Sequence, residues 1–254
     1  MRNLCIITGA TSGIGLELAK IYSCFNIDLL LISSNINNLE KTKKLLDNNG
    51  ANIDILEMNL INGIDLEKLK EKTDNKLLYC LINNAGFGDL GDFVDSNLKK
   101  AQDMIDLNIK ALTSLSYFFL KKNKNTTTKS YLLNVGSVAS FMCGPKMAVY
   151  YATKAYVLSF TNAIRRENSN KFIKISCLCP GPTKTNFTKD FKFTPNVFKN
   201  IFAMKPYDVA LCAYYGLLKG KKVIIPGVTN YLMIKLIKFI PSSLVEVITK
   251  KIMG

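Results

Sequence analysis

The stretch that decides the fold class of this chain is TGATSGIG, residues 8–15, directly after the apolar run of residues 4–7. The apolar run predicts a buried strand, and the amphipathic residues 14–24 predict a helix after it. The three glycines permit a tight turn that a phosphate can approach, and the start of the helix offers free N–H groups to an anion. The spacing differs from the more familiar G-x-G-x-x-G fingerprint, so this stretch alone also fits a plain tight turn.

Short apolar runs alternate with longer amphipathic runs along the rest of the chain. Strands are predicted at 4–7, 28–32, 53–57, 77–82, 130–135, 172–179 and 222–225, and helices at 14–24, 38–46, 66–72, in a long stretch reaching 120, at 148–166 and at 208–218. This order predicts an α/β fold, a Rossmann-type doubly wound sheet of about seven parallel strands with helices on both faces. Ligands of such sheets bind at the carboxyl ends of the strands.

The composition excludes several classes of chemistry. The chain has 254 residues, with 34 Lys and Arg against 19 Asp and Glu, and it has no histidine. Catalytic Ser-His-Asp or Cys-His arrangements and zinc sites that need imidazole are therefore excluded. Nearly all of the net charge of +15 comes from lysine, whereas base recognition usually relies on arginine, so no nucleic-acid partner is expected.

Cysteine usage and the start of the chain bear on the compartment. Seven cysteines, in a chain whose first residues run straight into a strand, predict reduced thiols in a cytoplasmic protein. Cys177 and Cys179 are expected to face opposite sides of their strand and to hold no metal. The sequence has no apolar run of about 18 residues, so no membrane-spanning helix is expected.

Two further motifs follow predicted strands. Residues 83–86 (Asn-Asn-Ala-Gly) are small enough for a ligand or a neighbouring loop to approach, and a structural turn explains them equally well. Ser137 follows the next strand, and Tyr150 and Lys154 come after it, four residues apart and so on one helix face. An ammonium near a phenol lowers the phenol pKa from about 10, which suits Tyr150 for proton transfer. Tyr151, its neighbour, is expected to serve only in packing.

Together these motifs resemble the short-chain dehydrogenase/reductase family over nearly the whole chain. The matching residues are Thr8 to Gly15, Asn83 to Gly86, Asn108, Ser137, Tyr150, Lys154 and Pro180-Gly181. The resemblance implies an oxidoreductase that transfers a hydride between a nicotinamide cofactor and a carbonyl or alcohol carbon.

The resemblance also implies roles for individual residues. Tyr150 would exchange the proton, Lys154 would bind the nicotinamide ribose and lower the pKa of Tyr150, and Ser137 would bind the substrate oxygen. Asn108, in the middle of a predicted helix, would support a water-linked proton relay to Lys154. The implied cofactor-binding residues are Gly9, Thr11, Ser12, Gly13, Ile14, Gly15, Ser34, Asn35, Asn59, Leu60, Asn84, Ala85, Gly86, Tyr150, Lys154, Pro180, Gly181, Thr183 and Thr185.

The end of the second predicted strand bears on which nicotinamide is used. An acidic residue there would bind the ribose hydroxyls and repel a 2′-phosphate. Residues 32–35 (Ile-Ser-Ser-Asn) contain no acid, and Ser34 stands where NADPH-preferring relatives often carry arginine. The sequence therefore favours NADP(H), with NAD(H) as the alternative.

Residues 1–230 are expected to form a single dinucleotide-binding catalytic domain with a substrate lid at about 185–205. The lid segment holds five phenylalanines, and further apolar residues precede Tyr150. The expected apolar wall is Phe187, Phe191, Phe193, Phe198, Phe202, Phe141, Met142, Cys143 and Met147. This wall favours an apolar carbonyl substrate, such as an acyl, steroid-like or aromatic ketone, over a sugar.

Residues 231–254 form an amphipathic, basic C-terminal extension. Three hypotheses fit it: packing over the substrate site or a partner subunit, lying on an anionic membrane surface, or joining the core. The family resemblance also implies a homo-oligomer. An alternative function is that of an NAD(P)(H)-binding sensor or scaffold without turnover, against which the presence of Asn108, Ser137, Tyr150 and Lys154 argues.

Overall fold

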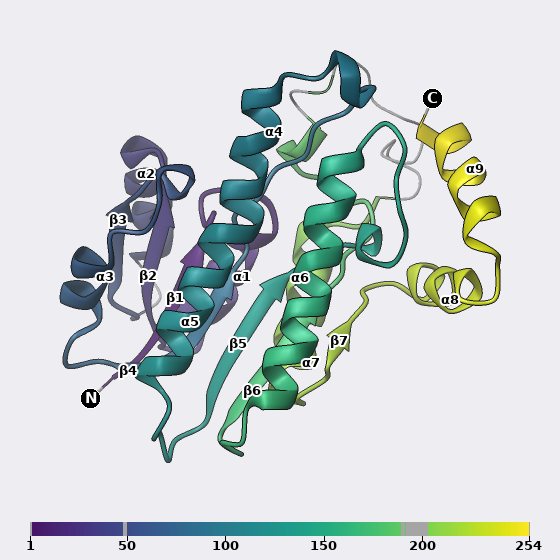
Figure 1. Cartoon of the computed structure of the whole chain (residues 1–254). Coiled ribbons are helices and arrows are strands. Elements are labelled where there is room, and N and C mark those ends of the chain that lie inside the picture. Colours follow the sequence, from purple (N-terminus) through teal and green to yellow (C-terminus); the bar gives the residue numbers. More distant parts are fainter. Residues whose placement is uncertain (1, 48–49, 189–190, 192–202, 254) are drawn as a thin grey trace.

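Seven apolar segments form one parallel sheet at the centre of the protein (Figure 1). The computed structural model describes residues 2–47, 50–188, 191 and 203–253. The strands are β1 Asn3–Thr8, β2 Asp28–Ser33, β3 Ile53–Glu57, β4 Leu77–Asn83, β5 Ser130–Val135, β6 Ile173–Leu178 and β7 Val223–Ile224. They lie in the order β3-β2-β1-β4-β5-β6-β7, with every neighbouring pair parallel, which confirms the predicted Rossmann-type sheet.

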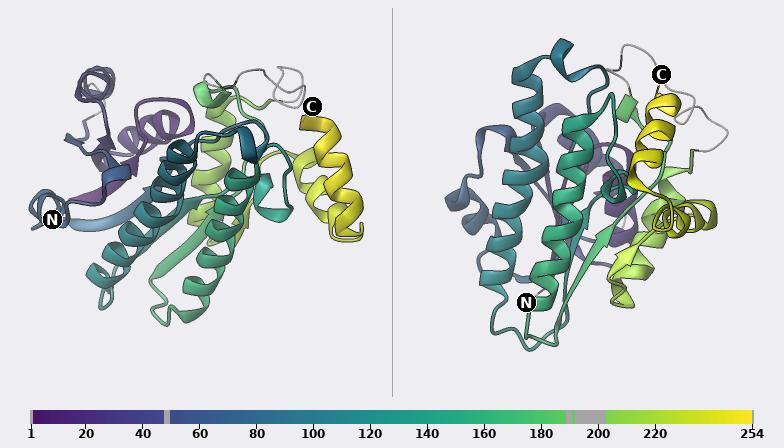
Figure 2. Two further views of the ribbon diagram at one scale, coloured as in Figure 1. Left: turned by 45° about the horizontal axis from the view of Figure 1, so that its top comes forward. Right: turned by 45° about the vertical axis from the view of Figure 1, so that its right-hand side comes forward.

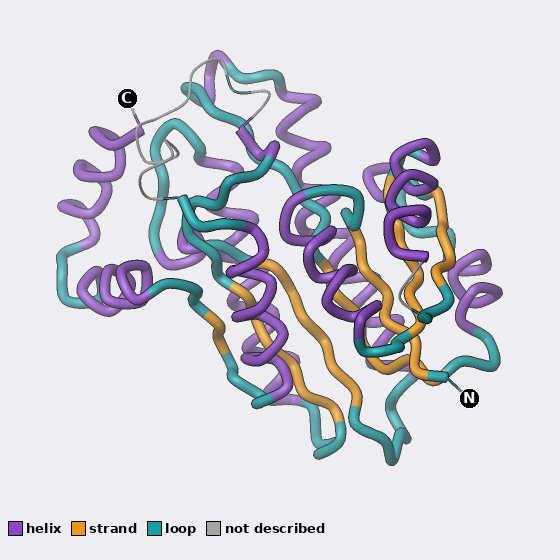
Figure 3. Tube along the Cα trace, turned by 180° about the vertical axis from the view of Figure 1, so that it is seen from behind, coloured by secondary structure: helices purple, strands orange, loops and turns teal. Residues whose placement is uncertain are grey.

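Helices connect the strands and cover both faces of the sheet (Figures 1 and 3). They are α1 Gly13–Cys24, α2 Ile36–Leu46, α3 Leu66–Thr73, α4 Leu98–Ile105, α5 Leu112–Lys122, α6 Ala148–Glu167, α7 Pro206–Leu218, α8 Val228–Ile237 and α9 Ser242–Met253. The long helical stretch predicted up to residue 120 consists of α4, a π-helical turn at Asp106–Ala111, and α5.

Alternation along the strands divides the core between the two faces. Ile7 and Leu31 pack with α1, α2 and α7 on one face, and Ile6 and Leu30 pack with α3 and α5 on the other. Because successive side chains of a strand point to opposite faces, strands buried on both sides read as continuous apolar runs. This pattern explains why the strand positions were readable from the sequence.

A buried ladder of polar side chains ties β4 and β5 to the helices on one face. Asn83 donates from Nδ2 to Asn134 Oδ1 at 2.8 Å and to Ser116 Oγ at 3.1 Å. Asn134 in turn donates to Thr161 Oγ1 at 3.0 Å. Asn83 and Asn134 are partners in the register of β4 and β5, so the ladder runs from α5 across these two strands to α6.

The direction of the chain crossovers reverses between β1 and β4, and this reversal positions the candidate site. β1 lies between β2 and β4, so the connections after β1 and β4 leave toward opposite edges of the sheet. A crevice at the carboxyl ends of the strands at such a point is the usual ligand site of an open α/β sheet. The glycine turn, residues 84–86 and Ser137 follow β1, β4 and β5 at these ends.

The C-terminal residues form two helices at the margin of the molecule, α8 and α9, separated at Pro241 (Figure 2). The first of them begins at Val228, just before the predicted extension. The division into a catalytic domain of 1–230 and an extension of 231–254 stays a prediction. Within the described residues, no helix is both long enough and apolar enough to span a membrane.

Candidate active site

The glycine turn after β1 has the backbone shape that its sequence requires. Gly9 and Gly13 adopt positive φ angles of 63° and 54°, which disfavour any side chain. A Cβ atom added at Gly15 would collide with the carbonyl oxygen of Gly9. Ser12 precedes α1 as its N-cap, and its side chain makes no capping hydrogen bond. The first-turn N–H groups of α1 therefore have no side-chain cap, as an anion-binding helix start requires.

A clasp of hydrogen bonds joins this turn to the loop after β4. Thr8 Oγ1 accepts from the backbone N–H groups of Asn84 and Ala85, both at 3.0 Å. Asn84 Nδ2 donates back to the carbonyl oxygens of Thr8 and Gly9 at 3.0 and 3.1 Å. Two predicted cofactor-binding segments are thus held together. The part of Thr8 was not foreseen, because only the pairing of β1 with β4 brings it to Asn84.

Asn108 lies in the π-helical turn and is buried. Its Oδ1 accepts from Phe87 N–H at 3.2 Å, and its Nδ2 donates to Phe87 O at 3.0 Å and to Thr153 Oγ1 at 3.1 Å. A Cβ atom at Gly86 would lie 2.8 Å from Asn108 Oδ1 and 3.4 Å from Lys154 Nζ. The structure therefore brings Asn108 and Lys154 together around Gly86. A π-helical turn is a common device at functional sites.

Ser137 and Tyr150 approach each other from two different elements. Ser137 caps the short 3-10 turn Val138–Phe141 that follows β5, and its Oγ accepts from Ala139 N–H at 3.1 Å. Tyr150 lies in the first turn of α6. Burial raises the pKa of Tyr150 to about 12, and a hydrogen bond from Ser137 opposes that rise. The phenol is therefore protonated at neutral pH.

The expected lowering of the Tyr150 pKa by Lys154 is wrong for this structure. Lys154 Nζ lies 5.9 Å from the centre of the Tyr150 ring and donates to the carbonyl oxygen of Val135 at 2.8 Å. Desolvation of the phenolate therefore dominates. Burial also lowers the pKa of Lys154 from 10.5 to about 8. The pair therefore consists of a phenol with a pKa of about 12 and an amine with a pKa of about 8.

The prediction that Cys177 and Cys179 face opposite sides is also wrong. Their Sγ atoms lie 3.7 Å apart, and both are buried against Gly136. Side chains two positions apart in an extended chain point to the same side, which brings the two thiols together. All seven cysteines are free thiols.

The end of β2 carries one acidic neighbour that the sequence analysis missed. Asn35 caps α2, and its Oδ1 accepts from Asn38 N–H at 3.0 Å. Glu57, at the end of β3, pairs with Ser33 in the sheet, and its Oε1 accepts from Ile36 N–H at 3.1 Å. A carboxylate therefore reaches the residues beside Ser34 from the neighbouring strand. The parallel pairing of β2 with β3, if predicted, would have indicated that Glu57 lies beside Ser33.

The remaining predicted adenine contacts, Asn59 and Leu60, follow β3. Asn59 Oδ1 accepts from Ile61 N–H at 3.2 Å and caps a short 3-10 turn. Leu60 is buried in the core on the α3 and α5 face. Both residues lie at the carboxyl end of β3.

The predicted clamping loop lies over the glycine turn. A Cβ atom at Gly13 would come within 2.9 Å of Thr185 Cγ2. Thr183 Oγ1 donates to Gly181 O at 2.9 Å, and the carbonyl oxygen of Pro180 accepts from Val138 N–H at 2.9 Å. The loop is thus tied to the turn that Ser137 caps. Of the other glycine-turn residues, Thr11 is half-buried and Ile14 packs against the core.

Apolar side chains gather around Tyr150. Its ring lies 5.2 Å from that of Phe187, which lies 5.6 Å from Phe191. Met142 and Met147 belong to the same cluster, whereas Phe141 packs with Val157 and Cys143 is exposed. The other three expected lid residues, Phe193, Phe198 and Phe202, lie outside the described residues.

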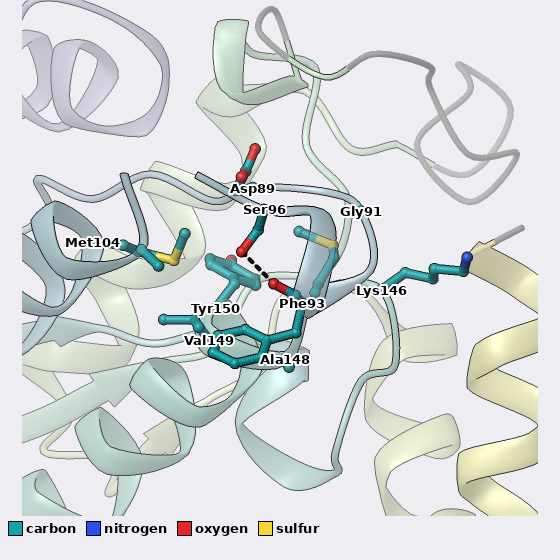
Figure 4. Close-up of a pocket in the computed structure, with 11 residues that line it drawn as sticks. Asp89, Gly91, Phe93, Ser96, Met104, Lys146, Ala148, Val149 and Tyr150 are labelled. Carbon is teal, nitrogen blue, oxygen red and sulfur yellow. Dashed lines mark hydrogen bonds between the residues drawn. The ribbon is translucent and has the colours of Figure 1, made fainter. Parts of the chain in front are cut away.

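A hollow opens beside Tyr150, between α4 and the start of α6 (Figure 4). Met104, Met147 and Val149 supply apolar lining, and Asp89 and Lys146 stand at its polar margin. Ser96 Oγ donates to Phe93 O at 2.7 Å and steadies the loop before α4. Tyr151 is not among the residues that line the hollow, and its ring packs on Gly144, as expected of a packing residue.

The family of the chain follows from its match to a model of known proteins. The model described as short chain dehydrogenase matches residues 3–195. The chain belongs to the short-chain dehydrogenase family. This match confirms the resemblance inferred from the sequence motifs and identifies the protein as an oxidoreductase that uses a nicotinamide cofactor.

Several relatives of this short-chain dehydrogenase have names that describe an activity. An NADP-dependent 3-hydroxy acid dehydrogenase of Schizosaccharomyces pombe is 30% identical over 238 residues, covering 87% of this chain and 88% of the relative. A 3-oxoacyl-acyl-carrier-protein reductase of Buchnera aphidicola is 29% identical over 201 residues, covering 78% and 79%.

Solved structures agree with the fold. A short-chain dehydrogenase of Sphingobium yanoikuyae in complex with NADPH superposes with a TM-score of 0.81 at 25% identity, covering 95% of this chain and 97% of that one. A Burkholderia phymatum short-chain dehydrogenase/reductase in complex with NAD has a TM-score of 0.81 at 20% identity, covering 92% of each chain.

Proposed function

We propose that this short-chain dehydrogenase interconverts an apolar ketone and its secondary alcohol with NADP(H), and that Tyr150 exchanges the proton with the substrate oxygen. The observation that carries the proposal is the meeting of four side chains at the carboxyl ends of β4 and β5. Asn108 and Lys154 lie next to Gly86. Ser137 hydrogen-bonds to Tyr150 in the first turn of α6.

Each of these side chains has a distinct part in the proposed reaction. Tyr150, protonated at neutral pH, donates its proton to the substrate oxygen in reduction and accepts one in oxidation. Ser137 holds the same oxygen in place. Lys154, with a pKa of about 8, returns a proton to Tyr150 from the side of Asn108. The side chain of Asn108 is held by hydrogen bonds to the backbone N–H and C=O groups of Phe87, so Asn108 positions the proton relay to Lys154.

The residues present fit a nicotinamide dinucleotide. The uncapped start of α1 and the positive φ of Gly9 and Gly13 suit a pyrophosphate, because backbone N–H groups can approach it closely. Thr183 and Thr185 would hold the carboxamide, and Ser34 and Asn35 would face the adenosine ribose. A bound nicotinamide supplies or accepts the hydride.

Two observations support NADP(H) over NAD(H). Residues 32–35 contain no acid, and the relative from Schizosaccharomyces pombe is named as NADP-dependent. The Glu57 carboxylate beside Ile36 opposes this preference, since it would repel a 2′-phosphate. We infer that the hydroxyl and amide groups of Ser34 and Asn35 outweigh this repulsion.

The apolar surroundings of Tyr150 support an apolar substrate. Phe187, Met104 and Met147 lie around its ring, and apolar side chains of this kind line most small-molecule pockets. Aromatic or acyl-chain ketones are therefore expected to be reduced well, and sugars poorly.

The test combines cofactor titration with turnover. NADPH and NADH are titrated by fluorescence into wild type, Tyr150→Phe and the control Tyr151→Phe, and each sample then receives ketones and sugars. We expect tighter binding of NADPH, turnover of apolar ketones by wild type and Tyr151→Phe, and a loss of about 100-fold or more in Tyr150→Phe. Binding without turnover of any compound would favour a sensor, and no binding of either cofactor would refute the proposed function.

A further inference from the structure

The outward sides of α8 and α9 carry large apolar side chains that the rest of the described chain leaves uncovered. We call this surface the tail face and define it by Val228, Leu232, Leu236, Phe239, Leu244 and Val247. Phe239 is 86% exposed and Val228 75%. Large exposed apolar patches of this kind usually mark an interaction surface.

The helical spacing explains why the tail face points outward. In α8, positions 228, 232 and 236 follow each other at four-residue steps and share one side of the helix, and Phe239, just beyond its end, continues this stripe. Ile234, two residues from both Leu232 and Leu236, points the opposite way and is buried. Among residues 242–251 of α9 the buried side chains are Val245 and Thr249, with Leu244 and Val247 on the outside. Each helix therefore touches the protein along one narrow seam.

Contacts along this seam fix the tail to the loops of the candidate site. Asn230 lies against Gly181, at which an added Cβ atom would be 2.5 Å from the Asn230 amide. Thr249 Oγ1 lies 3.9 Å from Met142 Sδ, and Glu246 lies 3.5 Å from Cys143 Sγ. Both helices thus stand beside residues that follow Ser137 and Pro180, at the margin seen in Figure 2.

Positive charge surrounds the tail face. Residues 228–251 contain four lysines, all exposed, and a single acid, Glu246. The lysines are Lys235, Lys238, Lys250 and Lys251. Lys235 Nζ lies 5.5 Å from the centre of the Tyr231 ring, so its stem runs along the helix surface. Lysine stems of this kind cover apolar surface while the ammonium groups remain in a polar layer.

A second copy of this chain or a lipid bilayer could cover the tail face, and the lysines around the apolar side chains distinguish between these two partners. A second copy seated face to face would bring its lysines against these lysines, with only one acid per copy to compensate. Like charges at the edge of an apolar contact disfavour such a pairing. An anionic bilayer offers acyl chains to the apolar side chains and headgroup charges to the lysines.

We propose that the tail face binds the surface of an anionic lipid bilayer, with α8 and α9 lying in the interface. Neither helix is long enough to cross a membrane. Helices that combine an apolar side with a lysine border lie flat at the headgroup boundary. This proposal does not depend on the proposed oxidoreductase function, and its test needs no substrate.

The test is flotation of the full chain with phosphatidylcholine vesicles, with and without phosphatidylserine. We expect flotation only with phosphatidylserine, weakening as salt is raised. Leu236→Ser with Phe239→Ser should reduce vesicle binding by about tenfold or more, while Val94→Ser, an exposed apolar residue outside the tail face, should leave it unchanged.

A second pair of variants separates the local charge from the net charge. Lys235→Glu with Lys238→Glu should abolish flotation, whereas Lys41→Glu with Lys44→Glu in α2, with the same change in net charge, should not. Absence of flotation with phosphatidylserine, or equal flotation of tail and control variants, would overturn the proposal. A dimer in solution that Leu236→Ser with Phe239→Ser dissociates would instead assign the tail face to a second copy.

Discussion

Replacing Lys154 by methionine should stabilise the folded protein while it removes the proposed activity. Lys154 is 6% exposed, and burial lowers the pKa of its ammonium group from 10.5 to about 8. Its charged form is therefore disfavoured in the folded chain relative to the unfolded chain. Methionine keeps an unbranched apolar stem and carries no charge.

The magnitude follows from the pKa values and one hydrogen bond. The gap between 10.5 and about 8 corresponds to about 3 kcal/mol of unfolding free energy at neutral pH. Loss of the 2.8 Å bond from Lys154 Nζ to Val135 O removes about 1 kcal/mol. The net gain of about 2 kcal/mol corresponds to a rise in Tm of about 4–8 °C for a chain of this size.

The pH dependence of this gain has a defined sign. The folded pKa lies below the unfolded value, so the penalty is fully present below about pH 8. As the pH rises from about 8 toward 10.5, the folded state releases its proton first, and the penalty disappears. The advantage of Lys154→Met over wild type should therefore shrink across this range.

The assay is thermal unfolding of wild type, Lys154→Met and the control Lys41→Met across this pH range. Lys41 is exposed in α2, so its replacement should change Tm little at any pH. A lower Tm for Lys154→Met than for wild type at neutral pH would refute the reasoning. An advantage that stays constant from neutral pH to 10.5 would refute the assignment of the gain to the buried charge.

Three further predictions follow from contacts at the site. Thr8→Val leaves the N–H group of Ala85 without its acceptor, whereas the N–H group of Asn84 keeps the carbonyl oxygen of Ile82 as a second acceptor. Urea unfolding should therefore show a loss of about 1–3 kcal/mol, and Thr8→Ser should recover most of it. Equal stability of Thr8→Val and wild type would contradict this. Gly15→Ala forces a Cβ atom against Gly9 O and should weaken NADPH binding by more than about tenfold, as read by cofactor fluorescence, so unchanged binding would refute the turn geometry. Glu57→Gln removes the carboxylate beside Ile36 and should tighten NADPH binding relative to NADH binding by about tenfold. Equal changes in the Kd values for NADPH and NADH would show that Glu57 does not face the cofactor.

The sheet was readable from the sequence because its strands are buried on both faces. The predicted bounds of β3 and β5 match the structure. The positions of Ser137, Tyr150 and Lys154 followed from motif order and helical spacing, which are local properties of the chain.

Features that depend on pairing between distant segments were not readable in this way. Glu57 reaches α2 only because β3 pairs with β2, and Thr8 meets Asn84 only because β1 pairs with β4. The Tyr150 pKa was misjudged for a similar reason. Helical spacing fixes the closeness of Tyr150 and Lys154, but the depth of burial, which dominates here, is set by the whole fold.

The polar ladder of Asn83, Ser116, Asn134 and Thr161 has a consequence for how the protein opens. Asn83 Nδ2, Ser116 and Asn134 bond to one another across β4, α5 and β5, and Asn134 bonds to Thr161 on α6, so separating these elements leaves desolvated amides or hydroxyls unpaired. β4, β5, α5 and α6 should therefore unfold as one cooperative unit, whose amide hydrogens exchange most slowly. Gly86 and Ser137 lie just past the ends of β4 and β5, so the proposed catalytic groups are supported by the part of the molecule that should be the last to open.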